Sequence, residues 1–217
     1  MDKRDAALAK SFPVATVPKY GDFEPLADNG QRLLIAANGF FLEVRRDWMH
    51  AIQECAYREG EIRYPFGELD SLLGLPIGNQ IGKLIQDFVA IARASLPNEC
   101  GAVGIFDRVT GRCKLKACVS LSASRSRLTY VPPIMAQAES IAVDIHSHGD
   151  APAFFSATDD ADDVTAVKIA ICVGRVDTEA PEICARLCLS GLFLPLVLSN
   201  YSSAPLDDVA AAGTIPS

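Results

Sequence analysis

Two histidines, a serine and an aspartate form a spaced string that has the composition of a metal site. His146 and His148 are followed by Ser156 and Asp159, an H-x-H-x7-S-x2-D pattern. On a strand, side chains two residues apart point to the same face, so the two imidazoles can bind one ion. A carboxylate on a loop that turns back over the strand end can supply a third ligand. Two imidazole nitrogens and one carboxylate oxygen suit zinc, and three protein ligands leave its fourth position for water, as in catalytic sites.

Glu99 is the candidate for the group that moves protons. Water bound to zinc loses a proton near neutral pH, and hydrolysis needs a neighbouring group that accepts this proton and passes it to the leaving group. Glu99 lies in the sequence PNECG, residues 97–101, where a predicted helix ends and an apolar run begins. Cys100 follows it directly. Because adjacent strand residues point to opposite faces, we assign the Cys100 thiol to packing and Glu99 to the site.

In this order and spacing, Glu99, His146, His148, Ser156 and Asp159 resemble the JAMM (MPN+) motif of the JAB/Mov34 metalloprotease family. The resemblance covers residues 79–198. It implies one zinc ion per chain bound by the two histidines and the aspartate, with the glutamate as general acid/base and the serine stabilising the tetrahedral intermediate. The implied activity is that of a zinc-dependent metallopeptidase or isopeptidase that hydrolyses an amide bond.

The N-terminal stretch, together with a JAB domain of this short form, is similar to the PRTRC system protein A family. Bacterial cassettes of that family also encode ThiF-like and ParB-like proteins. This resemblance implies a protein or peptide substrate, ubiquitin-like or sulfur-carrier-like, and ThiF-like partners. Between Lys116 and Asp144 there is too little chain for the insertions with which eukaryotic deubiquitinating members hold ubiquitin. Any protein substrate is therefore expected to be held differently.

Several positions have a second interpretation. Gly149 and Phe155 stand where many JAMM proteins have proline, which predicts a differently shaped loop. Ser156 and Asp159 also fit a helix capping box, which is compatible with a role in the site. Asp144 shares a strand face with the histidines, where it either orients one of them or bonds a neighbouring backbone group. We expect three further carboxylates to complement the helix N-terminus and to face water: Asp160, Asp162 and Asp163.

The alternative function is a non-catalytic MPN-type scaffold or interaction module, because many MPN domains have lost the metal. The intact set of five motif residues argues against it. A DNA-linked role, raised by the ParB-like context, has no support from the acidic composition. Retention of a bound metal distinguishes the metallopeptidase from the scaffold, and salt-sensitive DNA binding would indicate the DNA-linked role.

Composition is typical of a soluble intracellular enzyme. With 217 residues, 49% of them hydrophobic, the chain can bury a substantial core. Its formal charge of -7 argues against broad affinity for nucleic acids or anionic membranes. Apolar runs are too short for a signal peptide or a membrane span, which predicts a cytoplasmic protein. The seven cysteines, an odd number at scattered positions, are expected to be reduced.

Hydrophobic spacing predicts elements in two parts. Residues 1–30 show no period, residues 32–36 and 39–45 form a predicted hairpin through Asn38-Gly39, and the boundary lies near Gly78. Residues 47–58 carry apolar side chains at helical spacing, which predicts a helix capped by Asp47. His50 lies off this apolar stripe and is expected on the surface, not as a ligand.

The second part begins with a helix capped by Asn79 that ends before Pro97 and delivers Glu99. A further helix follows Ser156. The predicted fold is α/β (mixed α+β): a JAB/MPN-like mixed β-sheet flanked by helices over 79–198, with an N-terminal accessory α+β region over 1–78 and a flexible tail over 199–217. Strands are expected over 102–106, 113–121, 128–131, 141–148, 167–173, 183–189 and 192–198.

Overall fold

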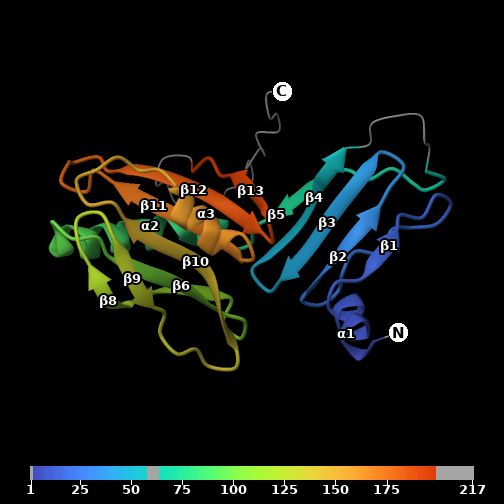
Figure 1. Ribbon diagram of the computed structural model, residues 1–217, viewed down its shortest axis with the longest axis horizontal. Helices are drawn as coiled ribbons and strands as arrows, with labels where there is room; N and C mark the ends of the chain where they lie inside the picture. The colour runs from blue at the N-terminus through green and yellow to red at the C-terminus, as the bar shows by residue number, and fades with distance from the viewer. Residues whose placement is uncertain (1, 58–63, 199–217) are drawn as a thin grey trace. The chain divides into compact units, whose positions relative to one another are not determined.

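The computed structural model describes residues 2–57 and 64–198. The chain divides into two compact units, Met1–Pro76 and Ile77–Ser217, which are described separately (Figure 1). The stretch 199–217, predicted as a tail, lies outside the described residues. Within the described residues, no helix is both long and apolar enough to cross a membrane.

The first unit is built on a five-stranded sheet in which the strands follow their order in the chain (Figure 1). Only β1 and β2 pair in parallel, and the later neighbours are antiparallel. The helix α1 precedes the sheet. The hydrophobic core of this unit contains Val17, Leu34, Ala36, Phe41 and Ile52. The elements are α1 (Lys3–Ser11), β1 (Val14–Thr16), β2 (Gly30–Ile35), β3 (Gly39–Arg46), β4 (Met49–Tyr57) and β5 (Leu72–Gly74).

The hairpin expected around Asn38-Gly39 is confirmed by β2 and β3. The helix expected over 47–58 is wrong. Asp47 and Trp48 form a tight turn, and β4 pairs with β3 from Arg46↔Met49 to Gly39↔Tyr57. The apolar residues fitted a helical period, but the backbone hydrogen bonds of a long hairpin outweigh that weak local signal. The sequence also gave no indication of α1, β1 and β5.

His50 differs from its expected surface position. It lies on β4 with a side chain that is 16% exposed, and its Nε2 is 2.9 Å from Oε1 of Glu43. Glu43 is fully buried on β3, and its other oxygen accepts a hydrogen bond of 2.6 Å from Arg32. The same Oε1 accepts the backbone N–H of Leu26 at 2.7 Å. His50 is therefore part of a buried polar cluster of the first unit.

The second unit contains a six-stranded sheet in the order β13-β12-β11-β10-β6-β7 and a separate hairpin of β8 and β9. Only β10 and β11 pair in parallel, so the sheet is mixed. This confirms the predicted mixed sheet flanked by helices. The strands are β6 (Gly101–Asp107), β7 (Arg112–Ala117), β8 (Val119–Ala123), β9 (Leu128–Val131), β10 (Glu139–Ser147), β11 (Val167–Gly174), β12 (Glu182–Leu189) and β13 (Leu192–Pro195).

Two helices lie on opposite faces of this sheet. Figure 1 shows α3 (Ala157–Asp163) in front of the strands and α2 (Gly78–Ser95) behind them. The amphipathic helix α2 contacts β6, β7 and β10. Its buried apolar residues are Ile81, Leu84, Ile85, Phe88 and Ala92. The central strands supply the rest of this core: Val143 and Ile145 from β10, and Ile169 and Ile171 from β11.

Three predicted boundaries of the second unit need correction. The helix α2 begins at Gly78 with Ile77 at its N-cap and no side-chain cap, so Asn79 lies in the first turn instead of capping it. The single strand expected over 113–121 is two strands, because the chain leaves the large sheet at Cys118 and β8 pairs with β9. Strand β13 ends at Pro195 rather than at Leu198. Proline lacks the N–H that a paired strand position requires.

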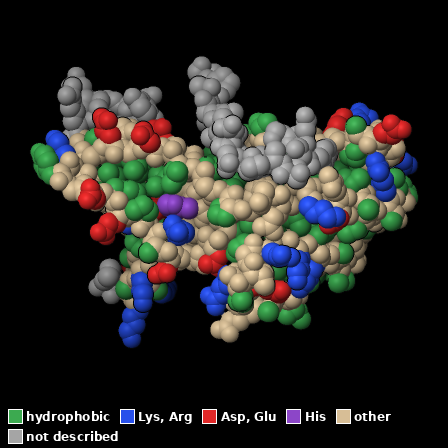
Figure 2. Space-filling model, turned by 180° about the vertical axis from the view of Figure 1, so that it is seen from behind, with side chains coloured by type: hydrophobic (Ala, Val, Ile, Leu, Met, Phe, Trp, Pro, Cys, Tyr) green, Lys and Arg blue, Asp and Glu red, His purple; other side chains and the backbone are tan. Residues whose placement is uncertain are grey.

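Charged side chains of both signs are interspersed over the face shown in Figure 2. All seven cysteines have free thiols.

Candidate metal centre

Strand β10 carries the histidine pair into a cleft of the second unit. His146 lies on β10 and His148 directly follows its last residue, and the cleft that both line has a volume of about 860 Å³. Its walls also include Glu99, Ser156 and Asp159. The structure therefore brings the four residues of the predicted string and Glu99 to one cleft. The loop after β10 turns at Gly149, whose φ of +57° is closed to proline because the proline ring fixes φ near −65°.

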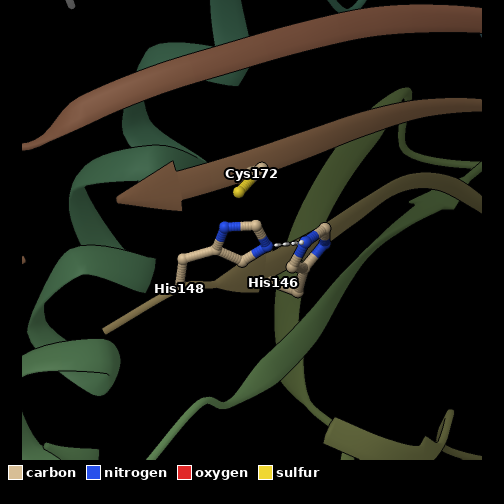
Figure 3. Close-up of side chains that lie close together, drawn as sticks. All are labelled: His146, His148 and Cys172. Carbon is tan, nitrogen blue, oxygen red and sulfur yellow. Dashed lines mark hydrogen bonds between the residues drawn. The ribbon is translucent and has the colours of Figure 1, made fainter. Parts of the chain in front are cut away.

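The two imidazoles have the separation of two ligands of one tetrahedral ion. The Nε2 atoms lie 3.2 Å apart (Figure 3). Two nitrogens at 2.0–2.1 Å from a tetrahedral zinc are about 3.3 Å apart. Nδ1 of His148 lies 3.1 Å from the carbonyl oxygen of Pro152, so this nitrogen carries the proton and Nε2 keeps its lone pair. Burial lowers the pKa of His146, which favours the neutral imidazole that binds metals.

Asp159 lies beside His146 and is held by Ser156. Its Oδ1 is 3.6 Å from Nε2 of His146. Its Oδ2 accepts hydrogen bonds of 2.6 Å from both the backbone N–H and the hydroxyl of Ser156. These two residues form the predicted capping box of α3. Burial alone would raise the pKa of Asp159, but the bonds from Ser156 and the nearby histidines hold it below its usual value, so the carboxylate is ionised.

Cys172, which is not part of the sequence motif, lies beside the two histidines. The metal-binding atoms of His146, His148 and Cys172 all lie within 4.8 Å of one another (Figure 3). Within the described residues, this group of three does not include Asp159. The parallel register of β10 and β11 pairs His146 with Cys172, so both side chains point to the same face. Local residue spacing does not reveal Cys172 as a neighbour of His146, because the two are 26 residues apart in the sequence.

Glu99 follows α2 and lines the same cleft as the histidines. Its backbone N–H donates to the carbonyl of Ser124 at 2.8 Å, which ties it to the β8–β9 hairpin. The next residue, Cys100, is bonded to Ser147, which stands between the two histidines in the sequence. Burial raises the pKa of Glu99, with a smaller upward effect from Asp159 opposed by His148. A carboxyl with a raised pKa is suited to exchange protons near neutral pH.

The β8–β9 hairpin packs directly over the first residue of β6. A Cβ atom at Gly101 would lie 3.1 Å from the ring of Tyr130 and 3.3 Å from Leu128. Any side chain at this position, two residues after Glu99, would have to displace the Tyr130 ring or Leu128 by a few tenths of an ångström. The hydroxyl of Tyr130 donates to Asp144 at 2.5 Å.

Asp144 does not play either of its expected roles in the hydrogen bonds of the structure. Its carboxylate accepts from Tyr130 and, at 2.6 Å, from Nζ of Lys168. Lys168 also contacts Asp163 at 2.7 Å. Burial would lower the pKa of Lys168, but these two carboxylates raise it. Lys168 therefore bridges the two carboxylates at this end of the cleft.

The expectation that Asp163 faces water is wrong, whereas the side chain of Asp160 is exposed, as expected. Asp163 is 3% exposed and Arg186 bonds both carboxylates, at 2.8 Å in the case of Asp163. The guanidinium of Arg186 lies between two rings, 4.0 Å from the centroid of Phe155 and 4.1 Å from that of Phe193. Phe155 in turn packs edge-on to His146 at 6.4 Å. Arg186 on β12 thus fixes α3 and the loop that carries Ser156.

Sequence comparison relates the second unit to a known family. Residues 82–188 match the prokaryotic homologs of the JAB domain. This segment contains all five motif residues and supports the JAB family for the second unit. Residues 2–76 match a domain of unknown function, DUF2016. No curated protein matches the chain. The JAB family includes hydrolases and often binds zinc, whereas the narrower PRTRC protein A assignment stays a prediction.

Proposed function

We propose that the JAB-like unit is a zinc-dependent metallopeptidase or isopeptidase of the JAMM type. One observation carries the proposal: two imidazole Nε2 atoms 3.2 Å apart, with a carboxylate oxygen 3.6 Å from one of them, in a cleft that Glu99 also lines. Chance pairs of histidines seldom combine this separation with a fixed tautomer and an adjacent ionised carboxylate.

The donor set fits zinc. His146 and His148 would hold the ion through Nε2, and Asp159 through Oδ1, because its Oδ2 is occupied by Ser156. Imidazole and carboxylate ligands in this number leave one position of a tetrahedral zinc open. When bound, zinc supplies Lewis acidity, which polarises a carbonyl group and makes water acidic near neutral pH.

The remaining chemistry belongs to the side chains. Glu99 takes a proton from the attacking water and delivers it to the nitrogen of the leaving amine, a task that its raised pKa favours. Ser156 donates its hydroxyl to the developing oxyanion once it turns from Oδ2 of Asp159. The rings of Phe154 and Phe155 pack against the histidines and help to orient them, at 4.6 Å from His148 and 6.4 Å from His146.

The substrate belongs to the same proposal. A cleft of about 860 Å³ has room for an extended peptide segment. We assign it a ubiquitin-like or sulfur-carrier-like protein, with a ThiF-like protein as a partner, on the strength of the resemblance of the whole chain to the PRTRC protein A family.

Metal content tests the proposal first. Purified untagged protein is compared with His146→Ala/His148→Ala and Asp159→Ala, and with Asp162→Ala as the control because Asp162 lines the cleft outside the donor set. We expect about one zinc per chain in the wild type and the control, and its loss in the other variants. Zinc-loaded protein is then incubated with C-terminally extended ubiquitin-like and sulfur-carrier-like proteins, and cleavage is followed by mass spectrometry with Glu99→Gln as the inactive control. Absence of zinc after reconstitution would overturn the proposal.

A scaffold function is the second candidate, and one observation favours it. The Ser156 hydroxyl donates to Asp159 at 2.6 Å, so its proton is already engaged within the protein. A scaffold would bind partner proteins equally well after Glu99→Gln and after loss of the metal. Cleavage that Glu99→Gln abolishes would exclude it.

A further inference from the structure

The floor of the candidate metal centre contains a thiol. Cys172 lies on β11 and is fully buried, and its register partner on β10 is His146. Its sulfur lies within 4.8 Å of the metal-binding nitrogens of both histidines (Figure 3). A hydrogen bond from the Phe154 backbone reaches the same sulfur, so loop and strand meet there.

We propose that Cys172 is a ligand of the metal ion that the histidine pair binds. The inference rests on the proposed metal site but changes its chemistry. Within the described residues, the compact group of three metal-binding side chains contains Cys172 and not Asp159. The nitrogen, nitrogen and sulfur donors come from the paired strands β10 and β11 and from the residue directly after β10, whereas Asp159 lies in the first turn of α3.

Coordination by Cys172 replaces a sulfur–hydrogen bond with a sulfur–metal bond, and the thiol proton is released to solvent. A thiolate prefers thiophilic ions, so the centre should favour zinc and cadmium over magnesium and manganese. If Asp159 binds the same ion, four protein ligands complete a tetrahedron and leave no open position. The resting centre would then be closed, and departure of the thiolate would open it.

The neighbouring thiols differ from Cys172 in ways that make them controls. Cys184 is the register partner of Cys172 on β12, but it is not a member of the donor group. Cys100 lies beside Ser147, and the two groups are bonded to each other on the other side of β10. Cys184→Ser is therefore the matched control for Cys172→Ser.

Cobalt spectroscopy of the full chain tests the inference. Metal-free wild type, Cys172→Ser, Cys184→Ser and His146→Ala are loaded with Co²⁺, and near-ultraviolet and visible spectra are recorded. We expect the intense thiolate-to-cobalt band in the wild type and in Cys184→Ser, and its loss in Cys172→Ser. Competition with Cd²⁺ should show at least tenfold weaker binding to Cys172→Ser than to Cys184→Ser.

The outcomes separate this inference from the proposed function. Visible cobalt bands that depend on His146, without the thiolate band in wild type, would overturn the sulfur ligand and leave the histidine site standing. A thiolate band that survives in Cys172→Ser would assign the sulfur to another cysteine and also overturn it. Cobalt bands that are insensitive to His146→Ala, or no bound cobalt, would overturn both. If a variant fails to fold, the presence or absence of the thiolate-to-cobalt band in the wild type still decides whether a sulfur ligand is present.

Discussion

Ser147 and Cys100 bind each other by backbone and side chain, and so fix the distance between the general base candidate and the histidines. The N–H of Cys100 donates to Oγ of Ser147 at 3.0 Å, and the N–H of Ser147 donates to the carbonyl of Cys100 at 2.9 Å. The side chain of Ser147 is fully buried. In the sequence, Ser147 stands between the two histidines, and Cys100 directly follows Glu99. The pair therefore couples Glu99 to the metal centre.

Ser147→Ala should lower stability and activity together without removing the metal. The buried N–H of Cys100 loses its acceptor, which costs about 1–2 kcal/mol, and Glu99 is less well placed. We expect a lower melting temperature and a reduced kcat with unchanged zinc content. Ser122→Ala, at an exposed position of β8, is the control. Loss of zinc in Ser147→Ala would contradict this role.

Glu99→Gln should abolish hydrolysis and yet stabilise the metal-free fold at neutral pH. Burial raises the pKa of Glu99 above its ordinary value of 4.5. The folded state then binds the proton more tightly than the unfolded state, so this group destabilises the fold as pH rises from 4.5 through the folded pKa.

The free energy of unfolding of metal-free wild type and Glu99→Gln should therefore be equal below the ordinary pKa and diverge above it. The gain of the variant at pH 7 is of the order of 1 kcal/mol or less, because Glu99 is only partly buried. Denaturant titrations across this pH range measure it, and activity should fall about 10²–10⁴-fold. The raised pKa of Glu99 would be refuted if the stability of Glu99→Gln relative to wild type fell, instead of rising, between pH 4 and pH 7.

Arg186→Met should loosen α3. The change leaves the buried Asp163 with one cationic partner instead of two, and removing one member of a buried ion pair costs about 3–5 kcal/mol. We expect weaker zinc binding as well, because Arg186 also supports Phe155 beside His146. Arg175→Met breaks the exposed pair with Glu182 and should cost less than about 1 kcal/mol. Equal costs for the two variants would show that burial of the Arg186 pair has no energetic effect.

Glu43→Gln should destabilise the first unit. Glu43 is fully buried and accepts from Leu26 and Arg32, and it contacts His50. The amide keeps the size of the side chain but leaves the partly buried guanidinium of Arg32 without a charged partner, at a cost of about 1–3 kcal/mol. Chemical denaturation followed by the fluorescence of Trp48, the single tryptophan, reports on this unit. Glu54→Gln on the exposed side of β4 is the control and should have no measurable effect.

The residues of the string were predictable because their geometry is local. The histidines obey the period of one strand, and Ser156 and Asp159 obey the period of one helix start. Cys172, Lys168 and Arg186 reach the site through the register between strands, which no local pattern encodes. The same limit explains the carboxylates of α3: Asp163 looks like a solvated helix-start residue until β12 places Arg186 against it.

The first unit shows how a local pattern misleads. Trp48, Met49 and Ile52 are buried in the structure, as their spacing indicated, but on a strand and its turn instead of a helix. Apolar spacing identifies which residues are buried with more success than it identifies the backbone that buries them.

The parallel pairing of β10 and β11 sets an order for the biosynthesis of the centre. During translation His146 and His148 leave the ribosome before Asp159 and well before Cys172, and β10 cannot pair with β11 until the intervening loop and α3 have been made. A nascent chain that ends before β11 has two histidines but neither the thiol nor the strand that backs them. The arrangement of both histidines and Cys172 at one site therefore forms only after β11 has been made.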